Sequence, residues 1–237
     1  MNTIDDAGLI IFDCDGVVAD SEPLATRVLQ ETLAEHGLSL TLDEVVSRFL
    51  GRSPETIAKV LRADFGLTFD AEMAEAMRLR LFHLFRTELR VIDGVEALLA
   101  SLPVPYCLAS SSQMERIETS LETIGLSRHF SGRIFNAAMV HRGKPAPDLF
   151  LHAAGVMGIQ PNQCVVIEDS PAGIEAGRRA GMRVIAFTGG GHARGVTYRE
   201  TIRQSEPTYI AETMNEVASL FRFSERPVAA LTHGVRA

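Results

Sequence analysis

LIIFDCDGVVADSE, residues 9–22, is the stretch from which the fold can be inferred. Its first four residues are apolar, which is typical of a short strand buried on both faces, and Asp13 follows at the carboxyl end of that strand. Asp15 and Gly16 come directly after it. In parallel α/β sheets ligands bind just beyond the carboxyl ends of the strands, so both carboxylates are candidates for chemistry. An Asp-Gly turn that only closes the strand is an equally good interpretation of this stretch alone.

The composition is that of an ordinary globular protein. The 237 residues are 46% hydrophobic and carry a net charge of -7, with acidic and basic residues mixed along the chain. This pattern provides no basic surface for nucleic acid or anionic membranes, and no apolar run approaches the roughly 20 residues of a membrane span. We therefore expect neither nucleic acid nor membrane among the partners. The oligomeric state is open, with a monomer as the simplest expectation.

The cysteine pattern bears on the cellular compartment. Cys14, Cys107 and Cys164 lie in or beside expected buried strands and show no C-x-x-C spacing. Packing as free thiols in a reducing compartment is the better interpretation of such cysteines. No secretory signal pattern opens the sequence, so the expected location is the cytoplasm.

Residues 21–90 have a helical pattern throughout. Apolar residues recur at helical spacing in four successive segments, and these are separated by stop and capping signals such as Gly37, Ser53 with Pro54, and Asp70. Four helices in a row, placed between one strand and the next, predict a small inserted helical cap. The expected domains are therefore a discontinuous core, residues 1–20 and 91–237, and a cap, residues 21–90.

After residue 90 the pattern changes to alternating strands and helices. Asp93 with Glu96, and Ser112 with Glu115, have the spacing of capping boxes that open helices. Alternation of this kind predicts a parallel sheet covered by helices on both faces, an α/β fold of Rossmann-like type. Further strands are expected at residues 104–109, 133–135, 164–167, 182–187 and 208–211.

Polar side chains follow several of these strands. Ser110 ends the second strand, Glu168 and Asp169 end the strand at 164–167, and Lys144 lies in the loop GKPAPD, residues 143–148. Separately, Ser110 could begin a turn and Lys144 could be a solvated loop residue. Two adjacent carboxylates after a buried strand instead favour a bound cation, because they repel each other. With Asp13 they suit magnesium-assisted phosphoryl transfer. The seven histidines are scattered and are expected at the surface or in loops.

The same segments carry a resemblance to a known family. FDCDGVVADSE, LASSS, GKPAPD and VIEDSPAGIEAGRRAG stand in the order of the four motifs of the haloacid dehalogenase superfamily. The helical segment between the first two motifs is where the beta-phosphoglucomutase-like branch carries its cap. Within that branch the chain looks most like bacterial phosphatases of 6-phosphogluconate and sugar phosphates. The resemblance implies a Rossmann-like core, a movable helical lid, and phosphatase activity on a small phosphate ester.

The resemblance also implies roles for individual residues. Asp13 would be the nucleophile that forms an aspartyl phosphate, and Asp15 would be the general acid and base, with a pKa raised toward neutrality. Ser110 and Lys144 would bind phosphate oxygens, and Ser111 stands where many relatives have Asn. The Mg²⁺ ligands would be Asp13, the Asp15 carbonyl, Asp169, and Glu168 directly or through water.

The cap is expected to contribute substrate specificity. Gly51 and Arg52 lie between two expected cap helices, in a loop that the resemblance places over the mouth of the site. Arg52 could bind a carboxylate or hydroxyls of the leaving group, and Gly51 could allow a close backbone approach. A solvated Arg and a helix-ending Gly explain the same residues equally well.

Two alternative functions stay open. A sugar phosphomutase has the same fold, but relatives with that activity carry a histidine soon after the first motif, where this chain has Glu22 to Ala25. A phospho-acceptor signalling module also combines paired Asp residues, a Ser or Thr and a Lys. In such modules the acidic pair precedes the acceptor, and no helical cap is inserted.

Overall fold

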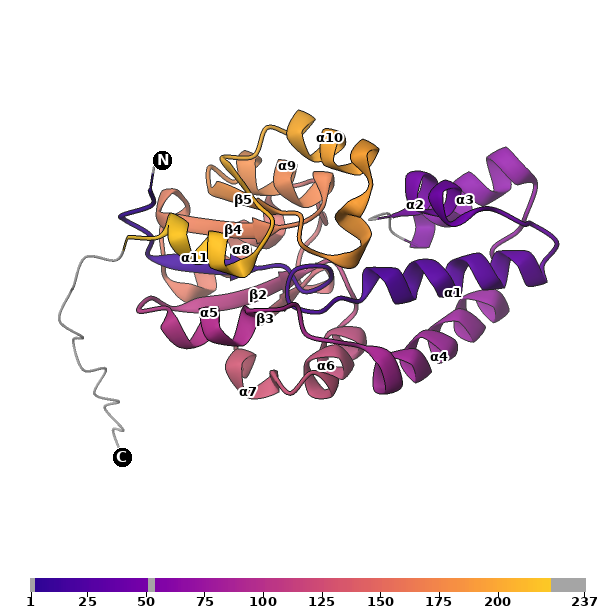
Figure 1. Ribbon diagram of the computed structural model, residues 1–237, viewed down its shortest axis with the longest axis horizontal. Helices are drawn as coiled ribbons and strands as arrows, with labels where there is room; N and C mark the ends of the chain where they lie inside the picture. Colours follow the sequence, from indigo (N-terminus) through magenta and orange to yellow (C-terminus); the bar gives the residue numbers. More distant parts are fainter. Residues whose placement is uncertain (1–2, 51–53, 223–237) are drawn as a thin grey trace.

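The centre of the fold is a parallel β-sheet (Figure 1). The computed structural model describes residues 3–50 and 54–222. In this part of the chain the sheet is 6-stranded, with the order β3-β2-β1-β4-β5-β6, and every neighbouring pair is parallel. The strands are β1 (Leu9–Phe12), β2 (Tyr106–Ser110), β3 (Ile134–Asn136), β4 (Cys164–Glu168), β5 (Arg183–Phe187) and β6 (Tyr209–Ala211). The predicted Rossmann-like α/β fold is confirmed.

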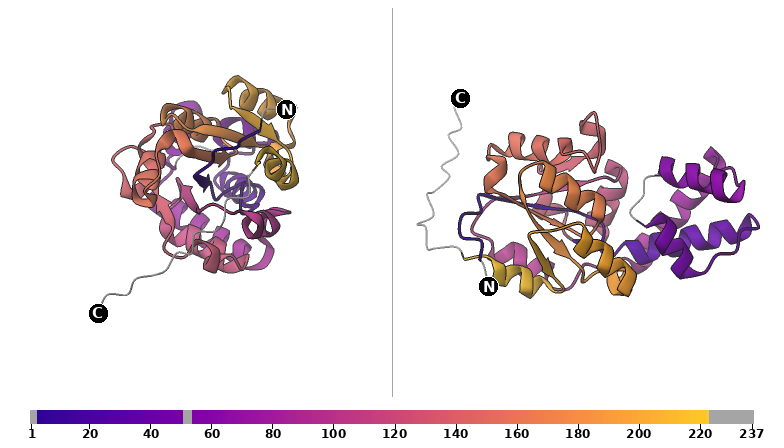
Figure 2. Two further views of the ribbon diagram at one scale, coloured as in Figure 1. Left: turned by 90° about the vertical axis from the view of Figure 1, so that its left-hand side faces the viewer. Right: turned by 90° about the horizontal axis from the view of Figure 1, so that it is seen from above.

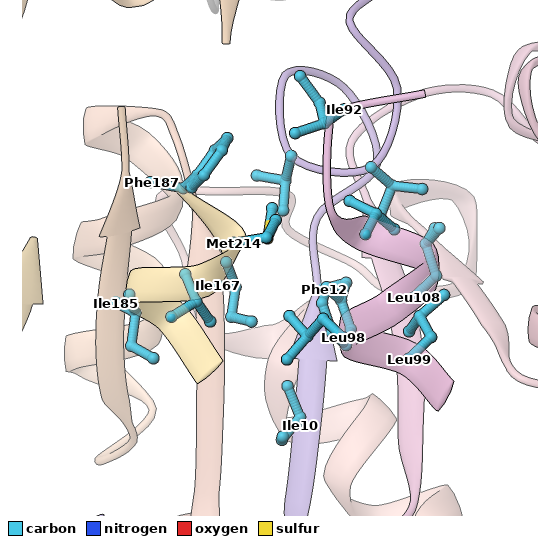
Figure 3. Close-up of a cluster of buried hydrophobic side chains, with 14 of the residues drawn as sticks. Ile10, Phe12, Ile92, Leu98, Leu99, Leu108, Ile167, Ile185, Phe187 and Met214 are labelled. Carbon is cyan, nitrogen blue, oxygen red and sulfur yellow. The ribbon is translucent and has the colours of Figure 1, made fainter. Parts of the chain in front are cut away.

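Strand β1 explains why four apolar residues occur in succession. It lies between β2 and β4, and all four of its side chains are buried. Ile10 and Phe12 enter the hydrophobic core on one face of the sheet, while Leu9 and Ile11 enter the core on the other. Figure 3 shows the first of these cores, where side chains of the strands meet those of the covering helices. Burial of a side chain as large as Phe12 stabilises the fold by roughly 1.5–3 kcal/mol.

Helices cover both faces of the sheet (Figures 1 and 2). Residues of α5, α6, α7 and α11 belong to the first core, and residues of α8, α9 and α10 belong to the second. Their bounds are α5 (Val95–Ser101), α6 (Met114–Thr123), α7 (Ser127–Phe130), α8 (Asp148–Met157), α9 (Pro171–Arg179), α10 (Val196–Gln204) and α11 (Met214–Leu220). Among the described residues, no helix is both long enough and apolar enough to cross a membrane.

Four helices form a cap between β1 and α5, as predicted. They are α1 (Glu22–Glu35), α2 (Leu42–Phe49), α3 (Pro54–Phe65) and α4 (Ala71–Glu88). The cap has a hydrophobic core of its own, which includes Leu33, Phe49 and Leu61, and it projects beyond one end of the sheet (Figure 2). Asp70 caps α4 as expected, because its side chain accepts a hydrogen bond from the Met73 N–H. The division of the chain at residues 20 and 90 stays a prediction.

Some expected local features are wrong. Helix α5 begins after Gly94 rather than Asp93, and α6 begins after Gln113, with no side-chain cap at either helix. The hydroxyl of Ser112 cannot cap α6 because it donates a hydrogen bond to Asp15. Helix α10 was not expected, since its sequence is largely polar and only Ile202 is deeply buried. Ser53, expected as the N-cap of α3, lies outside the described residues.

Candidate active site

The carboxyl ends of three adjacent strands bring the expected site residues together. Asp13 follows β1, Ser110 is the last residue of β2, and Glu168 is the last residue of β4. The Asp13 N–H donates to the Ile167 carbonyl at 2.9 Å, which continues the pairing of β1 with β4 and fixes the backbone here. All three side chains are buried from bulk solvent, yet they line a cavity of about 1000 Å³ that extends between the sheet edge and the cap.

Lys144 is the centre of the charge network in this cavity. Its Nζ donates hydrogen bonds to Oδ1 of Asp13 at 2.5 Å, to Oε1 of Glu168 at 2.6 Å and to the Ala109 carbonyl at 3.0 Å. An ammonium group has three N–H donors, so all of them are used. Burial alone would lower the pKa of Lys144, but the two carboxylates raise it above its ordinary value. The side chain is therefore a fixed cation, and the solvated-loop interpretation of Lys144 is wrong.

Glu168 is held on both of its carboxylate oxygens. Oε1 accepts from Lys144, and Oε2 accepts from the backbone N–H and the hydroxyl of Ser170, each at 2.9 Å. The close packing of α9 against this carboxylate requires Gly173, because a Cβ there would lie 1.8 Å from Oε1. Because a carboxylate has about four lone-pair sites, these contacts leave room for Glu168 to meet a metal directly or through water.

Asp15 has an environment different from the expected one. Its Oδ1 accepts from the Ser21 hydroxyl at 2.5 Å and from Arg116 Nη2 at 2.7 Å, while Oδ2 accepts from the Ser112 hydroxyl at 2.6 Å. Burial alone would raise the pKa of Asp15, but the Arg116 charge and these hydrogen bonds outweigh burial and lower it. The expectation of a pKa raised toward neutrality is therefore wrong for this arrangement.

Arg116 was missed in the sequence. It lies on α6, stacks over the Phe85 ring of the cap at 5.5 Å, and also approaches Oε1 of Glu22, with Nη2 at 3.6 Å. Burial raises the pKa of Glu22 to about 7, although Arg116 acts in the opposite direction. The sequence held no local signal for this Arg, because its partners Asp15, Glu22 and Phe85 come from distant segments of the chain.

A second group of residues missed in the sequence surrounds Asp169. Nε2 of His192 lies 3.0 Å from Oδ2 of Asp169, at an angle that falls short of a hydrogen bond, and the Tyr198 hydroxyl donates to the Asp169 carbonyl at 3.0 Å. Gly16 leaves room for this pair, because a Cβ there would lie 1.9 Å from Oδ2. His192 is buried, so its expected place at the surface is wrong. Its ring lies edge-on to Tyr198.

The buried carboxylates leave room for a cation. Burial raises the pKa of Asp13 well above its ordinary value; Lys144 lowers it, and the charges of Glu168 and Asp169 raise it further. The single positive charge of Lys144 thus does not neutralise the three carboxylates, and a divalent cation would supply the missing positive charge. Among the described residues no three His, Cys, Asp or Glu side chains are placed to enclose a metal. Mg²⁺ needs no such cage, because it is commonly held by one or two carboxylates and keeps several waters. Asp13, Asp169 and the Asp15 carbonyl form a set of this kind.

Three expected site residues remain to be placed: Ser111, Gly51 and Arg52. Ser111 lines the cavity beside Ser110, whose hydroxyl oxygen accepts a hydrogen bond from the Ser112 N–H at 3.0 Å. Gly51 and Arg52 lie outside the described residues.

Comparisons with known proteins identify the family of this chain. A family model described as haloacid dehalogenase-like hydrolase matches residues 8–181. The 6-phosphogluconate phosphatase of Escherichia coli (strain K12) is 31% identical over 190 residues, which cover 80% of this chain and 86% of that protein. Fructose-1-phosphate phosphatase YqaB of the same organism is 35% identical over 185 residues, which cover 76% of this chain and 95% of that protein. A solved haloacid dehalogenase-like protein of unknown function from Agrobacterium tumefaciens str. C58 superposes with a TM-score of 0.82 at 33% identity, covering 90% of this chain and 97% of that one.

Proposed function

Because this chain belongs to the haloacid dehalogenase-like hydrolase family and is a phosphoric monoester hydrolase, we propose that it is a Mg²⁺-dependent phosphatase acting through an aspartyl phosphate on Asp13. Its substrate is a small phosphorylated metabolite of the sugar, sugar-acid or polyol class. The names of the phosphatases to which it is similar support this class. The single observation that carries the mechanism is the position of Lys144 between Asp13 and Glu168.

The first step is attack by Asp13 on phosphorus. Lys144 holds Oδ1, and Oδ2 accepts no hydrogen bond from the described residues, so Oδ2 is free to form the new bond to phosphorus. The bond from phosphorus to the ester oxygen breaks as the new bond forms. The Lys144 ammonium reduces the repulsion between the carboxylate and the incoming phosphate, and the Ser110 hydroxyl can donate to a phosphate oxygen.

The second role belongs to Asp15. Its carboxyl group gives a proton to the leaving oxygen, and it later takes one from the water that hydrolyses the aspartyl phosphate, which returns Asp13 and releases inorganic phosphate. The low pKa of Asp15 in the described arrangement opposes the first of these transfers. A weaker contact between Asp15 and Arg116 would favour the protonated form that this step needs.

The metal would be held by Asp13, Asp169 and the Asp15 carbonyl, where it would supply positive charge for the phosphate oxygens. The remaining residues keep their own tasks. Glu168 orients Lys144, and Ser170 in turn orients Glu168.

The proposal also includes the cellular compartment and the oligomeric state. Three free, buried cysteines support the cytoplasm as the compartment. The proposed oligomeric state is a monomer.

A phosphate-release assay with Mg²⁺ over sugar, sugar-acid and polyol phosphates tests the proposal. The expected result is turnover of at least one class, with transient hydroxylamine-labile phosphate on the protein that is absent in Asp13→Asn. Interconversion of two sugar phosphates without phosphate release would instead identify a mutase. A phosphoprotein that persists for minutes without any turnover would identify a signalling module.

A further inference from the structure

The cations that line the cavity differ in how many of their donors are already used. Among the described residues these cations are Arg78, Arg116 and Lys144. Nε and Nη2 of Arg78 donate to Glu75, each at 2.8 Å, and its Nη1 donates to Glu115 at 2.9 Å. The three donors of Lys144 are used as well. Every nitrogen of these two side chains therefore already donates at least one hydrogen bond.

Arg116 is different. Within the described part of the chain its single hydrogen bond runs from Nη2 to Asp15, and its buried Nε has no partner. A guanidinium group has five N–H donors, and leaving them unsatisfied in a buried position costs free energy. Phe85 packs against one face of the group, so the remaining donors lie in the plane of the fork, where a carboxylate or phosphate binds best.

The place of Arg116 indicates which part of a substrate it meets. It contacts Asp15, which follows the nucleophile by two residues and would protonate the leaving oxygen. A ligand group at Arg116 therefore belongs to the leaving part of the ester and not to the phosphate that is transferred. Glu22 neutralises the positive charge of Arg116 only in part. Nη2 of Arg116 lies 3.6 Å from Oε1 of Glu22, and the pKa of Glu22 is raised to about 7.

We propose that Arg116 forms a subsite for a second acidic group, a carboxylate or a second phosphate, on the leaving part of the substrate. This inference rests on the proposed phosphatase function and narrows its substrate class. An acidic group at Arg116 competes with Asp15 for the guanidinium group. The substrate itself then replaces part of the contact between Arg116 and Asp15. A neutral substrate leaves that contact in place.

The test compares esters that differ only in the second acidic group. One pair is 6-phosphogluconate and sorbitol 6-phosphate, which differ by a carboxylate in place of an alcohol. The other pair is fructose 1,6-bisphosphate and fructose 6-phosphate, which tests phosphate as the second group. For the native protein we expect kcat/KM to be about 10- to 100-fold higher for the acidic member of at least one pair, as for a charged hydrogen bond. The pair that shows the preference identifies the acidic group.

Variants then assign the preference to Arg116. In Arg116→Met and Arg116→Gln the ratio of the two kcat/KM values within that pair should fall to about 1. This holds even if the variants lower kcat/KM for both esters. Ser112→Ala removes a neutral partner of Asp15 and keeps the cation, so it should leave the ratio unchanged. Inhibition by gluconate compared with sorbitol provides a binding measurement on the native protein that needs no variant.

Each other outcome has a definite meaning. Equal kcat/KM values within both pairs for the native protein, or a ratio that survives both Arg116 variants, would overturn the subsite and leave the phosphatase standing. Absence of phosphate release from every ester tested would overturn the proposed function, and the subsite with it.

Discussion

Oδ1 of Asp13 lies 2.5 Å from Nζ of Lys144, although 131 residues separate the two in the chain. The contact forms because β1 and the loop before α8 meet at the same edge of the sheet. It leaves the nucleophile with one oxygen held and one oxygen free.

Asp13→Asn should abolish phosphate release and leave the fold intact. The amide retains the shape of the side chain but loses the negative charge and the nucleophilic oxygen. Because the pKa of Asp13 is raised in the folded protein, ionised Asp13 opposes folding, and the variant should unfold no more easily than the native protein at pH 7. Phosphate release above the no-enzyme rate by the folded variant would refute Asp13 as the nucleophile.

Lys144→Met should destabilise the fold as well as abolish activity. The Lys144 side chain is 4% exposed, and its loss leaves the carboxylates of Asp13 and Glu168 without their shared cation. Removal of one partner from a buried ion pair costs about 3–5 kcal/mol. Urea unfolding at pH 7 measures this difference in the free energy of unfolding.

Arg142→Met provides the matched control for that variant. Arg142 pairs with Asp148, but its side chain is 67% exposed, so its loss should cost at most about 1 kcal/mol. If the two variants have equal free energies of unfolding, Lys144 does not hold the site together.

Much of this site could be inferred from the sequence because its residues follow buried strands. A strand such as β1 is recognisable from its apolar residues, and parallel topology brings the residues after each strand to one edge. Asp13, Ser110 and Glu168 meet for this reason. Lys144 instead lies on a loop. Apart from the family motif, no local sequence pattern indicates that it contacts Asp13.

The residues missed are those whose partners come from distant segments. Ser112 and Glu115 have the spacing of a capping box, but tertiary hydrogen bonding takes the Ser112 hydroxyl to Asp15. His192 looks like one more polar loop residue until α10 places Tyr198 beside it. The lowered pKa of Asp15 likewise depends on Arg116, which lies 101 residues away.

Glu22 should make stability depend on pH between about 4.5 and 7. Its pKa is raised from 4.5 to about 7, so in this range the folded state keeps a proton that the unfolded state has lost. The free energy of unfolding therefore falls as pH rises, by up to about 3 kcal/mol. Urea midpoints from pH 5 to pH 8 should show this slope in the native protein and a flatter curve in Glu22→Gln. The exposed α6 residue Glu118, changed to Gln, serves as the control and should keep the slope.

Removal of metal should abolish activity, and Mg²⁺ should restore it. The ion would neutralise the buried carboxylates of Asp13 and Asp169, whose pKa values are both raised by burial. Binding to the folded state alone also stabilises it, by about 2.7 kcal/mol when the ion is present at 100 times its Kd. Thermal unfolding with and without Mg²⁺ measures this effect independently of turnover. Asp169→Asn should reduce the shift in Tm, and full activity after exhaustive chelation would contradict the metal site.

His192 should orient Asp169 for the metal. Nε2 of His192 lies 3.0 Å from Oδ2 of Asp169 and so restricts the orientation of this carboxylate. Loss of such a supporting contact commonly weakens metal binding by about 10- to 100-fold. We therefore expect His192→Ala to raise the Kd for Mg²⁺ by this factor when it is measured by calorimetry well below the Tm. His192→Gln carries an amide that can reach the same oxygen, so it should recover part of the affinity.

Tyr198→Phe is the control for packing around this histidine. The variant keeps the ring that lies edge-on to His192 and loses only the hydroxyl that donates to the Asp169 carbonyl, so its effect on the Kd should be smaller. Loss of stability in His192→Ala is expected from the cavity alone and does not decide the question. The Kd does decide it, because a purely structural His192 would leave the Kd of the folded variant equal to the native value.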